Sequence, residues 1–326
     1  MQLSIIIVNY KSPELLAACI QSVLANTKNT EFEIIVVDND SKDNSRQFIS
    51  DKFPAIKWIQ MDYNAGFARA NNEGIRHSLS PIILLLNPDT IVFDNAIGNV
   101  LQHFSQSNYS ACGVQLINPD GSPQISGNYI KRGGLNYLLP LPFFGRLMKA
   151  TGNLFGVAKP NLPDSSGEVQ VDWVNGAFLM VKRSAFGQAG LMDEDFFLYA
   201  EEAEWCSRLR KHGKICIYGQ FKVIHLQSET ANTTFKSSGK GYYNLYDRKG
   251  LQIMLSNLVR IRKEFGVFWY LLIFFIYMIE IPFSVIMMLF GKISWKQWKG
   301  FVRNIAHLML FTPRIISNKP YFYKVL

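Results

Sequence analysis

Two apolar runs that each end in polar residues decide the fold of this 326-residue chain: residues 3–10 read LSIIIVNY, and residues 33–41 read EIIVVDNDS. Ser12 and Pro13 follow the first run as a helix N-cap and a proline at the first helical position, and apolar residues then recur at helical spacing. Strand and helix patterns keep alternating as far as residue 116. This alternation predicts an α/β fold whose mostly parallel sheet is covered by helices on both faces.

The remaining elements follow from the same patterns. Strands are predicted at residues 3–8, 33–37, 56–60, 82–86 and 111–116, and further helices at 43–50, 68–79 and 94–105. Beyond them we expect strands at 169–173, 177–181, 215–218 and 221–224, and a helix over 201–212 that Gly213 closes. Residues 118–170 are rich in Gly, Pro and Asn and show little periodicity, so two interpretations stay open: a mobile loop that faces the substrate, or a disordered insertion.

Charge is distributed unevenly along the chain. Residues 1–246 hold 22 Lys and Arg and 22 Asp and Glu, whereas residues 247–326 hold 12 against 3, so the whole net charge of +9 lies in this last part. The hydrophobic content of 48% and the charged content of 18% exclude a disordered chain, a collagen and a coiled coil. A basic and apolar tail after a neutral body points to an anionic membrane surface and not to nucleic acid.

The cysteines and the apolar run near the N-terminus indicate in which cellular compartment the protein resides. Cys19, Cys112, Cys206 and Cys216 show no CxxC spacing and have apolar neighbours, so we expect neither disulfides nor a zinc site. No basic leader precedes the apolar run at residues 4–8, which is too short for a signal peptide, and we expect the body to stay in the cytoplasm. A dinucleotide-binding dehydrogenase loses support, because the first strand is not followed by GxGxxG. A P-loop NTPase loses support as well, because the chain has no GxxxxGK(S/T) motif.

Polar residues follow the ends of the predicted strands. Asn9 comes after the first strand, Asp38 after the second and Asn87-Pro88-Asp89 after the fourth, while residues 64–72 read NAGFARANN. In parallel sheets the ligand lies beyond the carboxyl ends of the strands. A carboxylate there can accept hydrogen bonds from a nucleobase or ribose, or can hold Mg²⁺ or Mn²⁺ against a diphosphate. The alternative for any single aspartate is a turn or a helix cap.

A second polar set begins at residues 193–195, which read DED, and continues after an aromatic run with Glu201, Glu202 and Glu204. The three glutamates fall in the first turn of a predicted helix, where the helix dipole favours acids without any chemistry. The aromatic run before them should be buried, and a carboxylate in such partly dry surroundings can act as a general base on a hydroxyl. His225 ends a predicted strand, where it is either a core histidine or a metal ligand.

Together these motifs resemble family-2 glycosyltransferases, and among them the rhamnosyltransferase-like enzymes that extend bacterial surface polysaccharides. The matching stretches lie in order over residues 3–226: IIIVNY at 5–10, VVDNDS at 36–41, residues 64–72, LLNPD at 85–89, WVNGA at 173–177, residues 192–208 and His225. The resemblance implies a GT-A fold, a nucleotide-diphosphate sugar as donor, transfer with inversion and a divalent cation, Mg²⁺ or Mn²⁺. Inversion needs no enzymic nucleophile, and the sequence holds no obvious Ser-His-Asp or Cys-His set.

The resemblance also implies roles for single residues. It places donor binding on Asn9, Asp38, Asn64, Gly66, Asn71, Asn87 and Asp89, with Asp38 reading the donor base, and acceptor binding on Trp173, Asn175 and Gly176. Asp89 matches the last aspartate of the metal-binding triplet and His225 the histidine that completes the metal site, whereas Asn87 stands where many members have an acid. Glu201 and Glu202 match the acidic pair whose second member is the catalytic base, which favours Glu202 and leaves Glu201 as the alternative.

The basic tail contains the most apolar stretch of the chain. Residues 267–290 are apolar apart from Glu280, Pro282 and Ser284 and are long enough for one membrane span. A charge and a proline near the middle argue against a plain span, and the basic flanks would place both ends on the cytoplasmic side. We therefore expect a re-entrant or interfacial helical pair on the cytoplasmic face of the inner membrane, with a single pass as the alternative.

These predictions divide the chain into a GT-A catalytic domain over residues 1–246, with a donor-binding half at about 1–117 and an acceptor and catalytic half at about 118–246, and a helical membrane-associated tail over 247–326. The predicted activity is an inverting, metal-dependent transfer of a sugar, from dTDP-rhamnose or a UDP-sugar, to a lipid-linked saccharide in cell-surface polysaccharide synthesis. The alternative is a non-catalytic, membrane-attached protein that binds a nucleotide or a sugar on the same fold. Release of nucleoside diphosphate separates the two.

Overall fold

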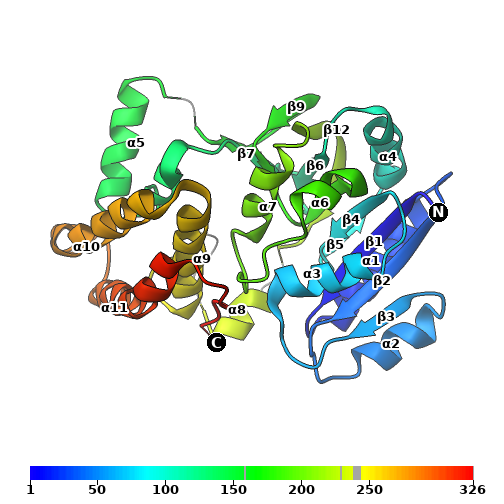
Figure 1. Ribbon diagram of the computed structural model, residues 1–326, viewed down its shortest axis with the longest axis horizontal. Helices are drawn as coiled ribbons and strands as arrows, with labels where there is room; N and C mark the ends of the chain where they lie inside the picture. The colour runs from blue at the N-terminus through cyan, green and yellow to red at the C-terminus, as the bar shows by residue number, and fades with distance from the viewer. Residues whose placement is uncertain (158, 228–229, 238–243, 326) are drawn as a thin grey trace. The chain divides into compact units, whose positions relative to one another are not determined.

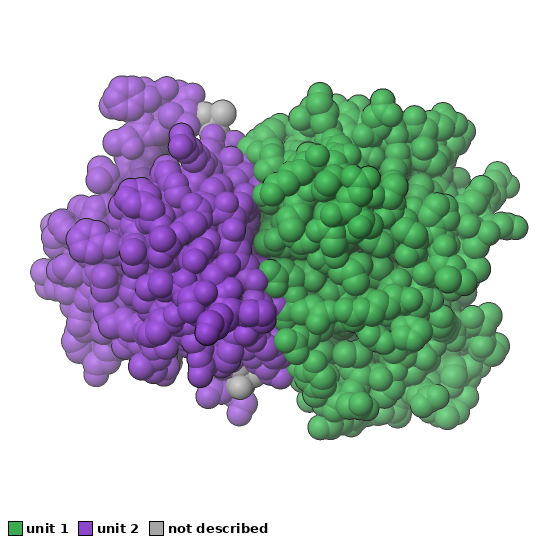
Figure 2. Space-filling model, viewed as in Figure 1, with its two compact units in different colours: residues 1–129, 161–194, 201–230 green, residues 130–160, 195–200, 231–326 purple. Residues whose placement is uncertain are grey.

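The computed structural model describes residues 1–157, 159–227, 230–237 and 244–325. The chain forms two compact units, which are coloured separately in Figure 2. The first unit consists of residues 1–129, 161–194 and 201–230, and the second of residues 130–160, 195–200 and 231–326. The predicted helical tail therefore belongs to a unit that also takes in two segments from the middle of the chain.

The first unit is built on a nine-stranded mixed sheet with helices on both faces (Figure 1). The strands run in the order β3-β2-β1-β4-β11-β6-β12-β5, and β9 pairs with β12 beside this path. Their bounds are β1 Leu3–Asn9, β2 Phe32–Asp38, β3 Lys57–Gln60, β4 Ile82–Leu86, β5 Thr90–Val92, β6 Ala111–Ile117, β9 Glu168–Val171, β11 Phe178–Lys182 and β12 Ile215–His225. A small second sheet joins β7 (Gly127–Asn128), β8 (Asn161–Leu162) and β10 (Trp173–Val174).

Side chains that alternate along the strands divide the apolar interior of this unit into two layers. Ile5 and Ile7 of β1 belong to a cluster with α1 (Pro13–Asn26), α2 (Ser45–Lys52) and α4 (Ala96–Gln106). Ile6, between them, belongs to a second cluster with α3 (Gly66–Arg76), α6 (Arg183–Ala189) and α7 (Glu201–Leu209). The central strands are thus buried on both faces, which is why they read as continuous apolar runs in the sequence.

The predicted α/β fold is confirmed, and the elements predicted up to residue 116 occur with bounds shifted by a few residues. Other features differ from the prediction. β11 lies between β4 and β6 and runs antiparallel to both. The strands predicted at 215–218 and 221–224 form the single strand β12, with an irregular register between Tyr218 and Lys222. The strand β5 and the helix α6 were not predicted, and α7 ends at Leu209, before the expected Gly213 cap.

The described part of residues 118–170 contains several short regular elements joined by irregular segments. Besides β7, β8 and β9 it contains the 3₁₀ helix η1 (Arg132–Leu138) and the helix α5 (Phe144–Leu154). A residue far away in the sequence caps the start of α5. The carboxylate of Glu280 accepts hydrogen bonds from the backbone N–H of Phe143 at 2.6 Å and from that of Phe144 at 3.0 Å. A pattern search along the local sequence cannot find such a partner.

The second unit is helical. Its main helices are α9 (Arg248–Phe265), α10 (Val267–Leu289) and α11 (Trp295–Ser317), and they surround one apolar cluster together with residues of η1. The short helix α8 (Thr230–Phe235) precedes them. Gly266 separates α9 from α10 with a left-handed φ of 93°, and Ser294 with Gln297 forms a capping box at the start of α11.

The long apolar run of the tail forms one continuous helix, α10, with Pro282 inside it, and not the expected helical pair. By length and composition α10 could cross a membrane. One face of α10 is buried in the helical unit, through Tyr270, Ile273, Phe274, Tyr277, Glu280 and Ser284. Other large apolar side chains of α10 are exposed, namely Phe268, Leu271, Phe275, Ile286 and Leu289. The helix therefore has one face against protein and another apolar face against solvent.

Candidate active site

The strand-end residues of β1 and β2 form one hydrogen-bonded group in the first unit. The parallel register pairs Asn9 with Asp38 at the carboxyl edge of the sheet. Asn9 is fully buried, and its Nδ2 donates to Oδ1 of Asp38 at 2.7 Å. Ser41 donates to the same carboxylate from its backbone N at 3.0 Å and from its Oγ at 2.6 Å. The VVDNDS motif thus closes a turn around Asp38.

The Asp38 carboxylate receives a fourth hydrogen bond, from Nε2 of Gln60 at the end of β3, at 2.8 Å. An ionised carboxylate offers about four acceptor positions, so the protein itself occupies the acceptors of Asp38. Three of the four bonds come from Asn9 and Ser41, which are buried, whereas Gln60 is exposed. Gln60 is therefore the one donor to Asp38 that comes from an exposed side chain.

The NAGFARANN segment forms the turn that leads into α3. Asn39 holds this turn with its side chain: its Oδ1 accepts from the backbone N of Ala65 at 2.7 Å, and its Nδ2 donates to Oδ1 of Asn64 at 3.1 Å. Gly66 has a left-handed φ of 74°, a conformation that a residue with a Cβ adopts only with strain. Asn64 and Gly66 thus shape the turn next to the Asp38 motif.

The two asparagines later in α3 make structural bonds. Nδ2 of Asn71 donates one turn back to the carbonyl of Phe67 at 2.9 Å. Asn72 is fully buried and binds Met192 twice, donating to its carbonyl at 2.8 Å and accepting from its N at 3.0 Å. Asn72 therefore ties the helix to the loop that leads toward the acidic segment.

The metal-site candidates come together through β5. The antiparallel register of β5 and β12 pairs Thr90 with His225. Nε2 of His225 consequently lies 3.4 Å from Oδ1 of Asp89, although the two residues are far apart in the sequence. Asp89 is only 6% exposed, and Asn87 is half-buried two residues before it. The strand β5, which was not predicted from the sequence, therefore brings Asp89 and His225 together.

Gln124 orients the His225 ring. Its Nε2 donates to the carbonyl of His225 at 2.7 Å and to Oδ1 of Asn118 at 2.7 Å, so its Oε1 is the atom that faces Nδ1 of His225 at 3.0 Å. With this amide assignment, Nδ1 carries a hydrogen and donates it to Gln124. Nε2 is then the ring nitrogen that faces Asp89. Ligating histidines are held in this way, by a bond from the other ring nitrogen.

The donor set fits a divalent cation that shares its coordination with a substrate. Among the described residues, no group of three or more His, Cys, Asp or Glu side chains is placed to hold a metal. Mg²⁺ in phosphate-binding sites, however, takes only one or two carboxylates and completes its shell with substrate phosphates and water. Asp89 and His225, adjacent and oriented, meet that requirement.

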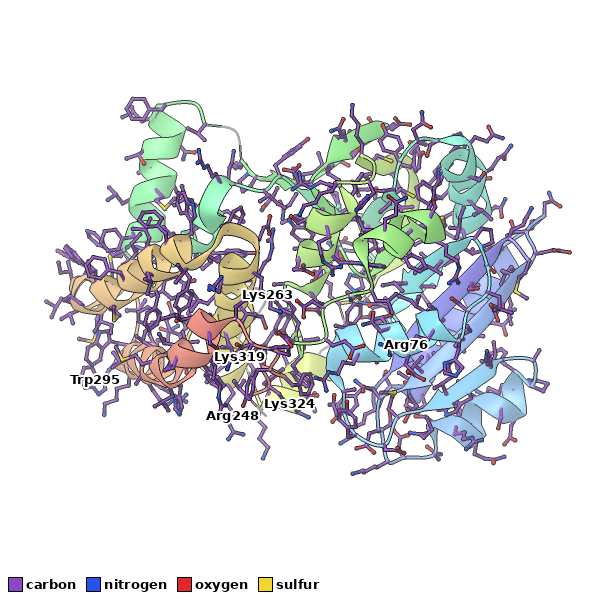
Figure 3. The ribbon with its side chains drawn as sticks, in the orientation of Figure 1. Arg76, Arg248, Lys263, Trp295, Lys319 and Lys324 are labelled. Atoms are coloured by element: carbon purple, nitrogen blue, oxygen red, sulfur yellow. The ribbon has the colours of Figure 1, made fainter. Side chains whose placement is uncertain are left out.

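Several acids near α7 have basic partners. Arg208 holds Glu204 through two hydrogen bonds of 2.7 and 2.8 Å, and Arg76, labelled in Figure 3, binds Glu194. Burial acts to raise the pKa of Glu194, but hydrogen bonds from Arg76 and Asn72 outweigh it and lower this pKa. Glu194 and Glu204 are thereby explained as structural groups.

Glu201 and Glu202 begin α7 and are 2% and 7% exposed. The two residues before them, Tyr199 and Ala200, both have left-handed φ angles, of 73° and 69°. Non-glycine residues in this region are strained, and such strain is concentrated at functional sites. The helix dipole favours an acid at this position, but it does not require two carboxylates to be buried there.

Gly176 lies beside Glu202. A Cβ at position 176 would be 3.4 Å from the ring of Phe67 and 3.8 Å from the Cβ of Glu202, so the glycine leaves space next to the candidate base. Asn175 shapes this turn, because its Oδ1 accepts from the backbone N of Ala177 at 2.9 Å. Trp173 is half-buried in β10 and packs against the second apolar layer.

Comparisons with known proteins agree with this arrangement. Residues 4–160 match the family described as glycosyl transferase family 2. Over 254 residues the chain is 33% identical to the low-salt glycan biosynthesis hexosyltransferase Agl10 of Haloferax volcanii, a match that covers 76% of this chain and 74% of that protein. The chain belongs to glycosyl transferase family 2.

Other similar proteins also transfer sugars. This family-2 glycosyltransferase is 28% identical over 208 residues to the N-acetylglucosaminyl-diphospho-decaprenol L-rhamnosyltransferase of Mycobacterium tuberculosis, covering 59% of this chain and 66% of that one. It is 25% identical over 229 residues to the dTDP-rhamnosyl transferase RfbF of Shigella flexneri, covering 68% and 67%. A crystal structure of GalNAc-T7 with UDP, GalNAc and Mn²⁺ aligns with a TM-score of 0.57 at 15% identity, over 83% of this chain and 50% of that one, which supports the GT-A fold.

Two residues that contact the candidate site residues were not singled out in the sequence. Gln60 is the last residue of the third predicted strand, so attention to the carboxyl ends of the strands could have found it. Gln124 lies in the stretch that showed no periodicity, and its bond to His225 depends on β12, so no local signal points to it.

Proposed function

We propose that this glycosyltransferase moves a sugar from a nucleotide-diphosphate donor, such as dTDP-rhamnose or a UDP-sugar, to a hydroxyl of a lipid-linked saccharide, with inversion at the anomeric carbon. The observation that carries the proposal is the pairing of β5 with β12, which brings Asp89 and His225 within 3.4 Å at the ligand edge of the sheet. Relatives that transfer rhamnose or hexoses support the choice of donor class.

In this proposal the nucleotide-sugar donor is bound by residues at the strand ends and in the turn before α3, namely Asp38, Asn9, Asn64, Gly66, Asn71, Asn87 and Asp89. Asp38 accepts a hydrogen bond from the nucleobase once Gln60 gives up its place, and the buried bonds from Asn9 and Ser41 keep the carboxylate oriented. Asn39 holds Asn64 and Gly66 in the adjacent turn. These residues bind and orient the donor, and we assign them no proton transfer.

Asp89 and His225 would hold Mg²⁺ or Mn²⁺ against the donor diphosphate. Such a cation stabilises the charge that develops on the departing diphosphate. Gln124 keeps the His225 ring in the orientation that binding requires. Asn87 has an amide where an acid is common in the family, so we give it a donor-binding role and no direct metal bond.

Glu202 is the proposed base, with Glu201 as the alternative. Its carboxylate takes the proton of the acceptor hydroxyl while the hydroxyl oxygen attacks the anomeric carbon, and the bond from that carbon to the diphosphate breaks. Gly176 leaves room for the acceptor beside Glu202, and Asn175 and Trp173 complete the acceptor side. Burial of Glu202 supports this role, because a partly dry carboxylate is a stronger base than a solvated one.

The second unit is the proposed membrane contact, on the cytoplasmic face. The exposed apolar side chains of α10 would enter the lipid interface while its other face stays in the helical unit. A peripheral attachment of this kind needs no transmembrane span. It would place the protein where a saccharide on a lipid carrier is presented, and the name of the mycobacterial relative points to such a carrier, a diphospho-decaprenol, for that enzyme.

The experiment is a transfer assay with the full chain in lipid vesicles. Nucleotide sugars are screened one at a time with a lipid-linked saccharide and Mn²⁺, and both nucleoside diphosphate and extended lipid are measured. Equal amounts of the two products, dependent on the acceptor, would support the proposal. Donor binding with no release of nucleoside diphosphate from any donor and acceptor pair would favour the non-catalytic alternative.

A further inference from the structure

The helical unit contains a hollow that the proposed chemistry does not use. It has a volume of about 440 Å³ and lies between the start of α9, the middle of α11 and the C-terminal segment. Four basic residues line it: Arg248, Arg303, His307 and Lys324. The described residues of its lining include no Asp or Glu, so the charged side chains of the lining are all cationic.

The basic side chains approach the hollow from separate elements. Arg303 and His307 stand one turn apart on α11, and Nδ1 of His307 bonds to the carbonyl of Arg303 at 2.9 Å. Arg248 comes from the first turn of α9 and Lys324 from the C-terminal segment, and Figure 3 shows these two at the same edge of the helical unit. In the part of the chain that the structure describes, neither Arg248 nor Arg303 forms an ion pair with an acid.

The chemistry of the lining points to one class of ligand. Guanidinium groups bind phosphate oxygens through paired hydrogen bonds, and the lining takes one guanidinium from α9 and one from α11. Leu251 and Phe311 add apolar surface to the same hollow. A ligand that uses both kinds of contact carries a phosphate next to a hydrocarbon chain. The exposed apolar face of α10, in the same unit, suits a ligand that resides in a membrane.

We propose that this hollow binds the phosphate or diphosphate head group of a membrane lipid. The inference rests on the proposed function only in one respect, namely that the lipid carrying the acceptor saccharide is among the candidates. Anionic phospholipids and polyprenyl diphosphates share the head-group chemistry, and vesicles of different composition distinguish them.

The test measures binding of the full chain to phosphatidylcholine vesicles that contain either a polyprenyl diphosphate or phosphatidylglycerol, at equal surface charge. The variant is Arg248→Ala with Arg303→Ala, which removes one cation from α9 and one from α11. The matched control is Lys296→Ala with Lys299→Ala, which removes the same charge from the first turns of α11 outside the lining. Thermal unfolding of both variants checks that the helical unit is intact.

The Arg248 and Arg303 variant should lose at least tenfold more affinity than the control variant for one of the two vesicle types, and that type identifies the lipid. Equal losses for both variants on both vesicle types would overturn the proposal, because the basic residues of the lining would then act only as a general positive surface. This assay contains no nucleotide sugar and measures no sugar transfer. Failure of the proposed transferase activity would therefore leave the binding result unaffected. Absence of lipid binding in the hollow would likewise leave the proposed transfer activity untouched.

Discussion

Nε2 of His225 lies 3.4 Å from the carboxylate of Asp89, and these residues meet only because β5 pairs with β12. The Gln124 side chain holds Nδ1 of the ring, so Nε2 is the ring nitrogen that faces the Asp89 carboxylate. Imidazole nitrogen and carboxylate oxygen are both ligands of divalent cations. The pair therefore offers one donor atom from each residue to a cation.

Gln124→Leu should weaken Mn²⁺ binding about 10- to 100-fold, because loss of the bond to Nδ1 frees the ring to rotate. Electron paramagnetic resonance of bound Mn²⁺, with a nucleoside diphosphate present, measures this without any turnover. Asp89→Ala, which removes a proposed ligand, should abolish metal-dependent nucleotide binding. Gln252→Leu is the control, because Gln252 is a buried glutamine of the second unit that bonds to Ser256 and Tyr323. Equal Mn²⁺ affinities in the Gln252 and Gln124 variants would contradict the positioning role.

Asp38→Asn should weaken binding of nucleoside diphosphate by roughly 10- to 100-fold, the range for loss of a hydrogen bond to a charged group. The effect should persist in EDTA, because Asp38 is assigned to the nucleoside and not to the metal. Isothermal titration with and without Mn²⁺ measures both conditions. Asp40→Asn, in the same turn, is the control and should bind normally. A loss that occurs only with metal present would place Asp38 in the metal site instead.

Glu202→Gln should lower kcat by about 10²–10⁴-fold, the usual contribution of a general base, while donor affinity stays near wild type. The amide keeps the size of the side chain but cannot take the acceptor proton. Glu201→Gln is the matched control, since Glu201 is the neighbouring buried acid of the same helix turn. Should Glu201→Gln be the inactive variant and Glu202→Gln retain turnover, the base is Glu201.

Replacing Phe268, Leu271 and Phe275 with serine should reduce binding to anionic vesicles at least a hundredfold. Each large apolar side chain that enters lipid contributes roughly 1.5–3 kcal/mol, and all three are exposed on α10. Vesicle sedimentation measures the loss, and thermal unfolding should be unchanged because no buried contact is removed. Leu24→Ser with Leu79→Ser removes exposed apolar side chains of the first unit and should bind as wild type. Unaltered binding by the α10 variant would place the membrane contact elsewhere.

Glu280→Ala should destabilise the helical unit by about 1–3 kcal/mol, because it leaves the backbone N–H groups of Phe143 and Phe144 without their acceptor. Glu280→Gln keeps one acceptor oxygen and nearly the same volume, so it should lose less. Chemical unfolding of the two variants gives the difference. Equal stability of Glu280→Ala and wild type would show that water replaces the carboxylate at no loss.

Much of the first unit was predictable from sequence. Strands such as β1 and β4 are buried on both faces, and this burial requires the continuous apolar runs that identify them. Asn9 and Asp38 follow such runs, and parallel register then brings them together. The antiparallel placement of β11 was not predictable, because its apolar run would suit a parallel neighbour as well.

The sequence by itself determined the alternation of strands and helices, the polar residues at the carboxyl ends of the strands and the apolar character of α10, since each follows from local spacing and side-chain type. Only the tertiary structure decided which of these residues meet. His225 reaches Asp89 through strand pairing, and Glu280, a charge that seemed out of place in an apolar helix, serves as the acceptor for the start of α5. Such contacts depend on long-range packing, because a hydrogen bond between distant residues leaves no periodic trace in either segment.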